Sequence, residues 1–180
     1  GYTTVQKTIL FQDNVAAKFG TGGDLEISNN GTDTYITEKT GNLYIRNQTD
    51  DKDVIFQSDD GSGGIETYFF LDGSSGGGAP FTQFPDASVI SMGTGQDLRI
   101  QHDGSNSYIE QTGIGNLYIK QTVDDGDIIF QCDDGSGGTE TYFYLDGSAN
   151  TDGNPRTKFP DNSRLMFGAG SDLDIFHDGS

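Results

Sequence analysis

The chain has 180 residues, with 28 Asp and Glu against ten Lys and Arg, and a net charge of −18 at neutral pH. Such an acidic surface repels phosphate, so the composition disfavours nucleic-acid binding. Only 32% of the residues are hydrophobic, and no apolar run approaches the roughly 20 residues that span a bilayer. We therefore expect no membrane insertion, and little material for a core within a single chain.

Residues 1–10 are interpreted as the end of a preceding unit or a connector, and a repeat unit then occupies residues 11–83. Helical apolar spacing is absent from this unit, and short clusters rich in β-branched and aromatic residues alternate with turn residues. The sequence therefore predicts six strands. In chain order they are Val15–Phe19, Leu25–Ser28, Thr34–Thr37, Leu43–Arg46, Val54–Gln57 and Glu66–Leu71.

A second repeat unit occupies residues 84–158, and a truncated start of a third occupies residues 159–180. Gly41–Ser74 and Gly115–Ser148 are identical at 25 of 34 positions. The third unit stops in mid-motif, so we expect the chain to be a piece of a longer polypeptide. The strands predicted for the second unit are Ser88–Met92, Leu98–Gln101, Ser107–Glu110, Leu117–Lys120, Ile128–Gln131 and Glu140–Leu145.

Tandem units of about 75 residues predict an all-β array in which each unit buries its apolar face against a neighbour. Most strands alternate, so that Leu25 and Ile27 lie on the face opposite Glu26. The runs at 128–130 and 142–145 are apolar on both faces, and we expect a second sheet or another chain to cover them.

Asn-Gly and Asp-Gly pairs punctuate the strands and predict turns in which glycine adopts a positive φ. Looser connectors are predicted at Gly76–Pro80 and Ala149–Pro155. The Gly-Ser-Gly-Gly sequences at 61–64 and 135–138 are interpreted as loops, because no Lys or helix follows them. The pairs are Asn30-Gly31, Asp60-Gly61, Asp72-Gly73, Asp103-Gly104, Asp134-Gly135, Asp146-Gly147 and Asp178-Gly179.

The Asp-rich turns also suggest calcium, since they cluster oxygen ligands at 59–61, 124–127 and 133–135. Neither EF-hand spacing nor the nonapeptide pattern of calcium β-rolls is met. We therefore predict no cofactor, with calcium at these turns as the alternative. His102 and His177 occupy equivalent positions, but Asn29 stands there in the first unit, which favours local hydrogen bonding over metal binding.

The sequence predicts no catalytic, cofactor-binding or metal-binding residues, and no enzyme. Cys132 stands where the first unit has Ser58, so we expect an inert side chain, with an interchain disulfide as the alternative. Tyr44, Tyr118 and Tyr144 would be able to stack on sugars, but packing within the sheet or between chains is the favoured interpretation.

The segment 93–109, Gly-Thr-Gly-x-Asp-Leu-x-Ile-x-His-Asp-Gly-Ser-Asn-Ser-Tyr-Ile, followed by Gly-Asn-Leu-Tyr-Ile at 115–119, resembles tail-fibre and other virion structural proteins of marine and cyanobacterial bacteriophages. Segments 127–138 and 142–147 belong to the same pattern, and Ser28–Gly31 of the first unit departs from it. The resemblance implies an elongated fibrous β-structure, such as a β-helix, β-prism or stack of units, in an intertwined homotrimer at the virion surface.

From these observations we expect a self-associating structural segment of an extracellular fibre, a phage tail-fibre shaft or adhesin used in host attachment. Its partners would be identical chains and a host-surface glycan or protein. Two alternatives stay open. One is a non-viral extracellular filament that polymerises through the repeats, and the other is a carbohydrate-binding or depolymerising module.

Overall fold

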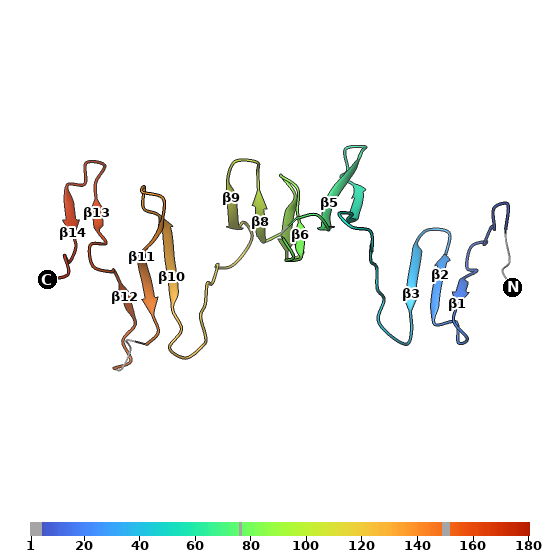
Figure 1. Cartoon of the computed structure of the whole chain (residues 1–180), viewed down its shortest axis with the longest axis horizontal. Helices are drawn as coiled ribbons and strands as arrows, with labels where there is room; N and C mark the ends of the chain where they lie inside the picture. Colours follow the sequence, from blue (N-terminus) through green and yellow to red (C-terminus); the bar gives the residue numbers. More distant parts are fainter. Residues whose placement is uncertain (1–4, 76, 149–151) are drawn as a thin grey trace. The chain divides into compact units, whose positions relative to one another are not determined.

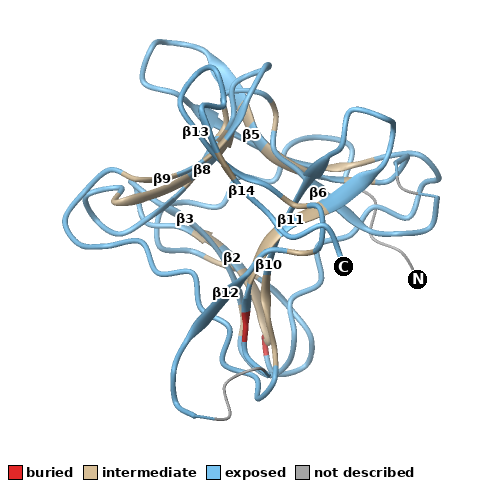
Figure 2. Ribbon diagram, turned by 90° about the vertical axis from the view of Figure 1, so that its left-hand side faces the viewer, coloured by how far each residue is buried: buried red, intermediate tan, exposed pale blue. Residues whose placement is uncertain are grey.

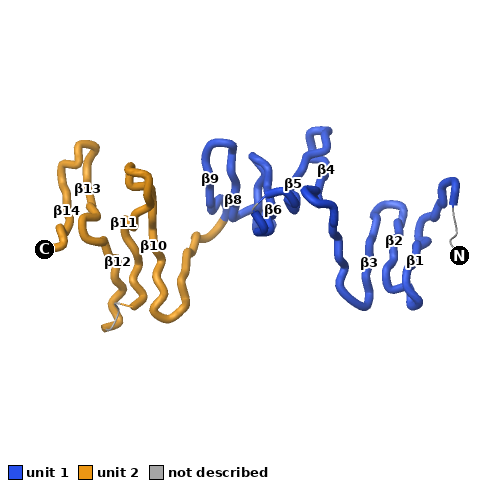
Figure 3. Tube along the Cα trace, viewed as in Figure 1, with its two compact units in different colours: residues 1–113 blue, residues 114–180 orange. Residues whose placement is uncertain are grey.

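The computed structural model describes residues 5–75, 77–148 and 152–180. Every regular element in these ranges is a β-strand, so the predicted all-β class is confirmed (Figure 1). Among these residues no helix is present that is long and apolar enough to cross a membrane. The chain divides into two compact units, residues 1–113 and 114–180 (Figure 3). Their boundary falls inside the second sequence repeat, so compact unit and sequence repeat are different divisions of the chain.

The first unit contains two three-stranded antiparallel sheets of the same design. In each, a row of apolar residues faces across all three strands: Ala17, Ile27 and Ile36 in one sheet, and Ile90, Ile100 and Ile109 in the other. The row arises because alternate residues of paired strands share a face. The strands are β1 (Ala17–Phe19), β2 (Leu25–Asn29) and β3 (Thr34–Glu38), then β7 (Val89–Met92), β8 (Leu98–His102) and β9 (Ser107–Gln111).

Between these two sheets in sequence lies a third sheet, formed by β4 (Val54–Asp59), β5 (Ile65–Asp72) and β6 (Phe81–Gln83). Its register shifts between Phe56 and Gln57, which marks a bulge in β4. Phe56 faces Phe69 across the strands, and their rings stack with centroids 4.5 Å apart. Phe84, just beyond β6, stacks on the same Phe69 at 5.6 Å.

The second unit repeats this design with nearly the same register. The bulge recurs between Phe130 and Gln131, and Phe143 stacks on Phe130 at 4.5 Å and on Phe159 at 5.8 Å. A two-stranded sheet follows, in which Leu165 faces Ile175. The strands of this unit are β10 (Ile128–Asp133), β11 (Thr139–Asp146) and β12 (Arg156–Lys158), then β13 (Leu165–Phe167) and β14 (Leu173–Ile175).

Two predicted strands are wrong. Leu43–Arg46 and Leu117–Lys120 form no ladder, although their sequence alternates as a strand does. Conversely, β6 and β12 were not predicted, because each is a three-residue strand beside a connector. Each pairs with the long strand before it. Part of the predicted connectors, Gly76 and residues 149–151, lies outside the described residues.

The turn prediction is right for five of the seven pairs. Their glycines have φ between +79° and +94°. Gly73 and Gly147 do not adopt a positive φ. A Cβ atom at these two positions would lie 2.4 Å from the carbonyl oxygens of Lys52 and Gly126, respectively. Glycine is therefore needed there for a close backbone approach, not for its backbone dihedral.

No apolar side chain among the described residues is buried (Figure 2). The runs that are apolar on both faces keep exposed members, including Ile129, Tyr142 and Leu145. No strand of one sheet has a Cα atom within 8 Å of a strand of another sheet in the described part of the chain. Each sheet is therefore a single layer, and its apolar row is left uncovered.

Candidate functional site

The carboxylates of the Asp-rich turns accept hydrogen bonds from nearby backbone N–H groups. Asp59 and Asp60 accept hydrogen bonds from the N–H groups of Gly61 and Ser62, at 2.6 and 2.8 Å. The Ser62 hydroxyl also donates to Asp60 and, together with the backbone N–H of Ser62, lowers the pKa of that carboxyl. Within the described ranges, no three His, Cys, Asp or Glu side chains lie together in a way that could hold a metal ion.

His102 and Asn29 make the same cross-strand contact. His102 Nδ1 lies 3.1 Å from Ser107 Oγ, and the Asn29 amide donates to Thr34 Oγ1 at 2.9 Å. Each pair joins the last residue of one strand to the first residue of the next. The local hydrogen bonding predicted for this position is therefore present. His177 Nδ1 accepts a hydrogen bond from the Gly179 N–H within its own turn at 3.0 Å, and it also lies 3.0 Å from Asp161 Oδ1.

The remaining single-residue candidates lie on different strands and coils of the chain. Cys132 is exposed in β10. Tyr44 and Tyr118 are exposed to 75% and 70%. Tyr144 is half-buried in β11, so its ring is less accessible to a sugar than the rings of Tyr44 and Tyr118. The Gly-Ser-Gly-Gly sequences lie in the loops that join β4 to β5 and β10 to β11, as predicted.

Two shallow grooves of the first unit lie on either side of the segment that begins at Phe84. One, of about 740 Å³, is lined by Phe69, Phe84 and Pro85 among others, with Glu66 and Arg99 at its border. The other, of about 450 Å³, lies over the Ile90–Ile100–Ile109 side of the next sheet and also includes Phe84. The groove over the isoleucines is predominantly apolar, whereas the larger groove is lined by polar and apolar residues in similar measure.

The uncovered apolar rows are the feature that recurs in the sheets. Ile27 and Ile36 are exposed, as are Ile100 and Ile109, and so are Leu165 and Ile175 in the third copy. A sheet normally buries one face against another layer. Large contiguous apolar patches on a protein surface are typical of sites that bind another protein, a membrane or a ligand.

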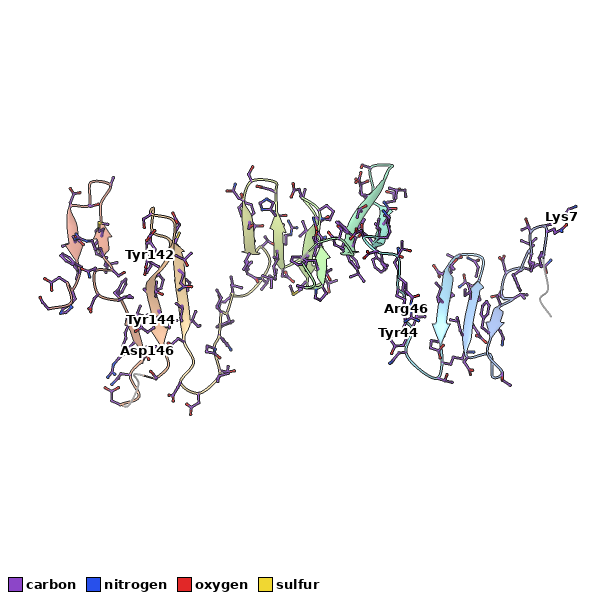
Figure 4. All side chains as sticks on the ribbon, viewed as in Figure 1. Lys7, Tyr44, Arg46, Tyr142, Tyr144 and Asp146 are labelled. Carbon is purple, nitrogen blue, oxygen red and sulfur yellow. The ribbon has the colours of Figure 1, made fainter. Side chains whose placement is uncertain are left out.

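The Gly-Asn-Leu-Tyr-Ile sequences at 41–45 and 115–119 are the second recurring feature. They are identical in both repeats, and each is followed by a cation, Arg46 or Lys120. Leu43 and Ile45 are both exposed. Figure 4 shows Tyr44 and Arg46 projecting from the coil between β3 and β4. The sequence indicated that these residues are apolar and β-prone, but it did not indicate that they pair with no strand in the described part of the chain.

Asp146 was predicted from the sequence only as the first residue of an Asp-Gly turn. It is only 8% exposed. Its carboxylate accepts hydrogen bonds from Ser148 and pairs with Lys158 at 2.6 Å. The hydrogen bond to Asp146 raises the pKa of Lys158. Asp146 ends β11 beside β12 (Figure 4), so its role is to hold a sheet edge together.

Comparison with protein families, with curated proteins and with solved structures found no match to this chain. The site is therefore interpreted from its own geometry.

Proposed function

We propose that this chain is a structural segment of an extracellular fibre that associates with identical copies of itself. Segment 93–109 resembles tail-fibre and other virion structural proteins of bacteriophages, and the fibre would be a phage tail-fibre shaft or adhesin. The observation that supports the proposal is that the sheets carry apolar rows which nothing in the described chain covers.

Elementary energetics favours association. Single three-stranded sheets are at the lower limit of independent stability. Fully burying an exposed Ile or Leu side chain contributes roughly 1.5–3 kcal/mol, and covering the partly exposed side chains of these rows contributes a fraction of that amount each. The rows Ala17–Ile27–Ile36 and Ile90–Ile100–Ile109 recur from one repeat to the next. Identical chains packed side by side would therefore cover the same row at every repeat.

The chemistry of the other features agrees with a mechanical role. The Asp carboxylates of the turns bind backbone N–H groups, and the repeats preserve strand registers and stacked phenylalanines. We propose a homotrimer at the virion surface, with host attachment as the purpose of the whole fibre. The trimer follows from the sequence resemblance, and the host-surface partner would be a glycan or a protein.

The test is the solution mass of the purified 180-residue chain, by sedimentation equilibrium and light scattering over a range of concentrations. The expected result is a discrete oligomer, three copies for the trimer. A compact monomer at all concentrations would overturn the proposal. Negative-stain images separate the alternatives, because a filament subunit would form polymers of unlimited length. Binding of the monomer to a glycan array would favour the carbohydrate module.

A further inference from the structure

The two Asn-Leu-Tyr-Ile segments, defined as residues 42–46 and 116–120, have the alternating pattern of a β-strand. Neither segment pairs with a strand in the described part of the chain. No backbone N–H or C=O of either segment makes a hydrogen bond in the described part of the chain. No residue of either segment has a positive φ. An extended backbone with open hydrogen-bonding groups is a ready partner for a sheet edge.

Side-chain contacts within the segments have the two-residue period of a strand. The Asn42 amide reaches Tyr44 Oη at 3.4 Å, and Asn116 reaches Tyr118 Oη at 3.5 Å. Lys120 Nζ lies 5.0 Å from the centroid of the Tyr118 ring. Asn, Tyr and the cation therefore share one face, and the opposite face of the second segment carries Leu117 and Ile119.

The outer edge of β9 matches the second segment in both polarity and charge. Over Ser107–Glu110 this strand pairs with β8 alone, on its inner side. Ile109 is 63% exposed at the end of its apolar row. The carboxylate of Glu110 makes no ion pair among the described residues.

We propose that residues 116–120 of one copy add as a parallel strand to the outer edge of β9 of a neighbouring copy. In this register Ile119 lies beside Ile109 and extends its apolar row by one strand. Lys120 then lies beside Glu110, so that opposite charges face each other across the strands. An antiparallel strand with the same Ile119–Ile109 pair would place Lys120 beside Tyr108, and the charge match would be lost.

The chain length between β9 and the segment requires a second copy. β9 ends at Gln111 and the segment begins at Asn116. Four intervening residues permit an antiparallel hairpin, whereas a parallel pair within one chain needs a crossover of about a dozen residues or more. In the first repeat Ile45 of one copy would lie beside Ile36 in β3 of another, but Arg46 would then lie beside Thr37, so no charge pair favours the parallel strand there.

This inference rests on the proposed self-association and names the contact that produces it. The test uses two single-cysteine chains of different size in a Cys132→Ser background, one carrying Lys120→Cys and the other Glu110→Cys. The chains are refolded together and oxidised, and the mixed disulfide is measured on a non-reducing gel. Control partners are Ser91→Cys, which shares the row of Glu110 at the opposite sheet edge, and Tyr108→Cys, the antiparallel neighbour.

The expected result is efficient cross-linking of Lys120→Cys to Glu110→Cys, with little to either control. If the wild-type chain associates but Lys120→Cys links to Glu110→Cys no better than to Ser91→Cys, the inference is overturned and the proposed function stands. Preferential linking to Tyr108→Cys overturns the parallel register. A wild-type chain that is monomeric overturns the proposed function itself.

Exchanging the two charges tests the Lys120–Glu110 pairing independently of the cysteine cross-links. Lys120→Glu should weaken association by up to about fivefold per contact, and adding Glu110→Lys should restore it. Circular dichroism of each variant checks that the sheets are retained. Weakening without restoration by the double variant contradicts the Lys120–Glu110 pairing.

Discussion

Phe69 stacks on Phe84 with ring centroids 5.6 Å apart, so the residue that begins the second repeat packs on a long strand of the first. Phe69 also stacks on Phe56, at 4.5 Å. Phe143 occupies the same central position between Phe130 and Phe159. Phenylalanines far apart in sequence thus form one stack of three rings in each repeat.

The central ring of each stack should matter most. Phe69→Ala removes two stacking contacts and Phe56→Ala removes one, each worth about 0.5–1.5 kcal/mol beyond area burial. We expect Phe69→Ala to lower the free energy of unfolding by roughly 1 kcal/mol more than Phe56→Ala. Urea unfolding of the associated chain measures the difference, and Phe143→Ala against Phe130→Ala repeats it in the second unit. Equal losses for both members of a pair would contradict the central position.

Gly73 should not tolerate a side chain. An alanine Cβ there would lie 2.4 Å from the Lys52 carbonyl oxygen, and the shift needed to relieve this contact would disturb the hydrogen bond from Gly73 N–H to Asp53. We expect Gly73→Ala to destabilise by about 1–3 kcal/mol, as overpacking does. Gly64 is a matched control, since it has open space around it and no positive φ. Thermal unfolding of the two variants compares them, and a Gly64→Ala loss as large as that of Gly73→Ala would count against the close approach.

Asp72 should titrate well below an ordinary aspartate. Hydrogen bonds from the Ser75 hydroxyl, from the Ser74 and Ser75 N–H groups and from the Ser74 hydroxyl lower its pKa from 3.8 to about 2. Because the folded pKa lies below the unfolded value, the stabilising contribution of Asp72 is present above about pH 4 and is lost as the pH falls through 2. Carboxyl chemical shifts followed by NMR during an acid titration measure the pKa directly.

Replacing the largest donor tests the cause of that shift. Ser75→Ala should raise the pKa of Asp72, while Ser62→Ala should raise only that of Asp60, whose main donor it removes. An Asp72 pKa that is unchanged in Ser75→Ala would assign the shift to another source.

His102 should be replaceable by the residue of the first repeat. Asn29 spans to Thr34 as His102 spans to Ser107, so His102→Asn should change the free energy of unfolding by no more than about 0.5 kcal/mol. His102→Ala, which removes the contact, should cost more. Thermal unfolding at neutral pH checks both, and a large loss in His102→Asn would point to a role that asparagine cannot fill.

The local sequence pattern located the strands that pair with the next strand in the chain. It did not identify which of the remaining segments have a pairing partner. Leu25–Ser28 and Thr34–Thr37 were predicted within a residue of β2 and β3, because alternation and an Asn-Gly turn act within one hairpin. Leu43–Arg46 has the same alternation but no intrachain ladder, since propensity reports a conformation and not a partner. β12, Arg156–Lys158, shares only its central threonine with β6, Phe81–Gln83, and its pairing depends on the backbone of β11.

The candidate site was harder to predict, because it consists of apolar side chains that no other element of the described chain covers. Composition indicated that one chain has too little apolar material for a core, and the exposed rows agree with that expectation. The requirement for glycine at Gly73 comes from the Lys52 carbonyl, 21 positions earlier, which no local turn rule includes. The burial of Asp146 likewise depends on strand neighbours and not on its Asp-Gly motif.

The short hairpin loops have a consequence for how the chain selects among its own copies. β4–β5 and β10–β11 are so alike that β4 would also pair with β11, and a duplicated sequence invites such exchange. Five residues separate β4 from β5, from Asp60 to Gly64, whereas about 80 separate β4 from β11. Closing the longer loop costs about 2.5 kcal/mol more in chain entropy. The Asp-Gly-Ser-Gly-Gly loops therefore favour correct strand pairing, because β4 pairs with the neighbouring β5 at a lower entropic cost than with the similar but distant β11.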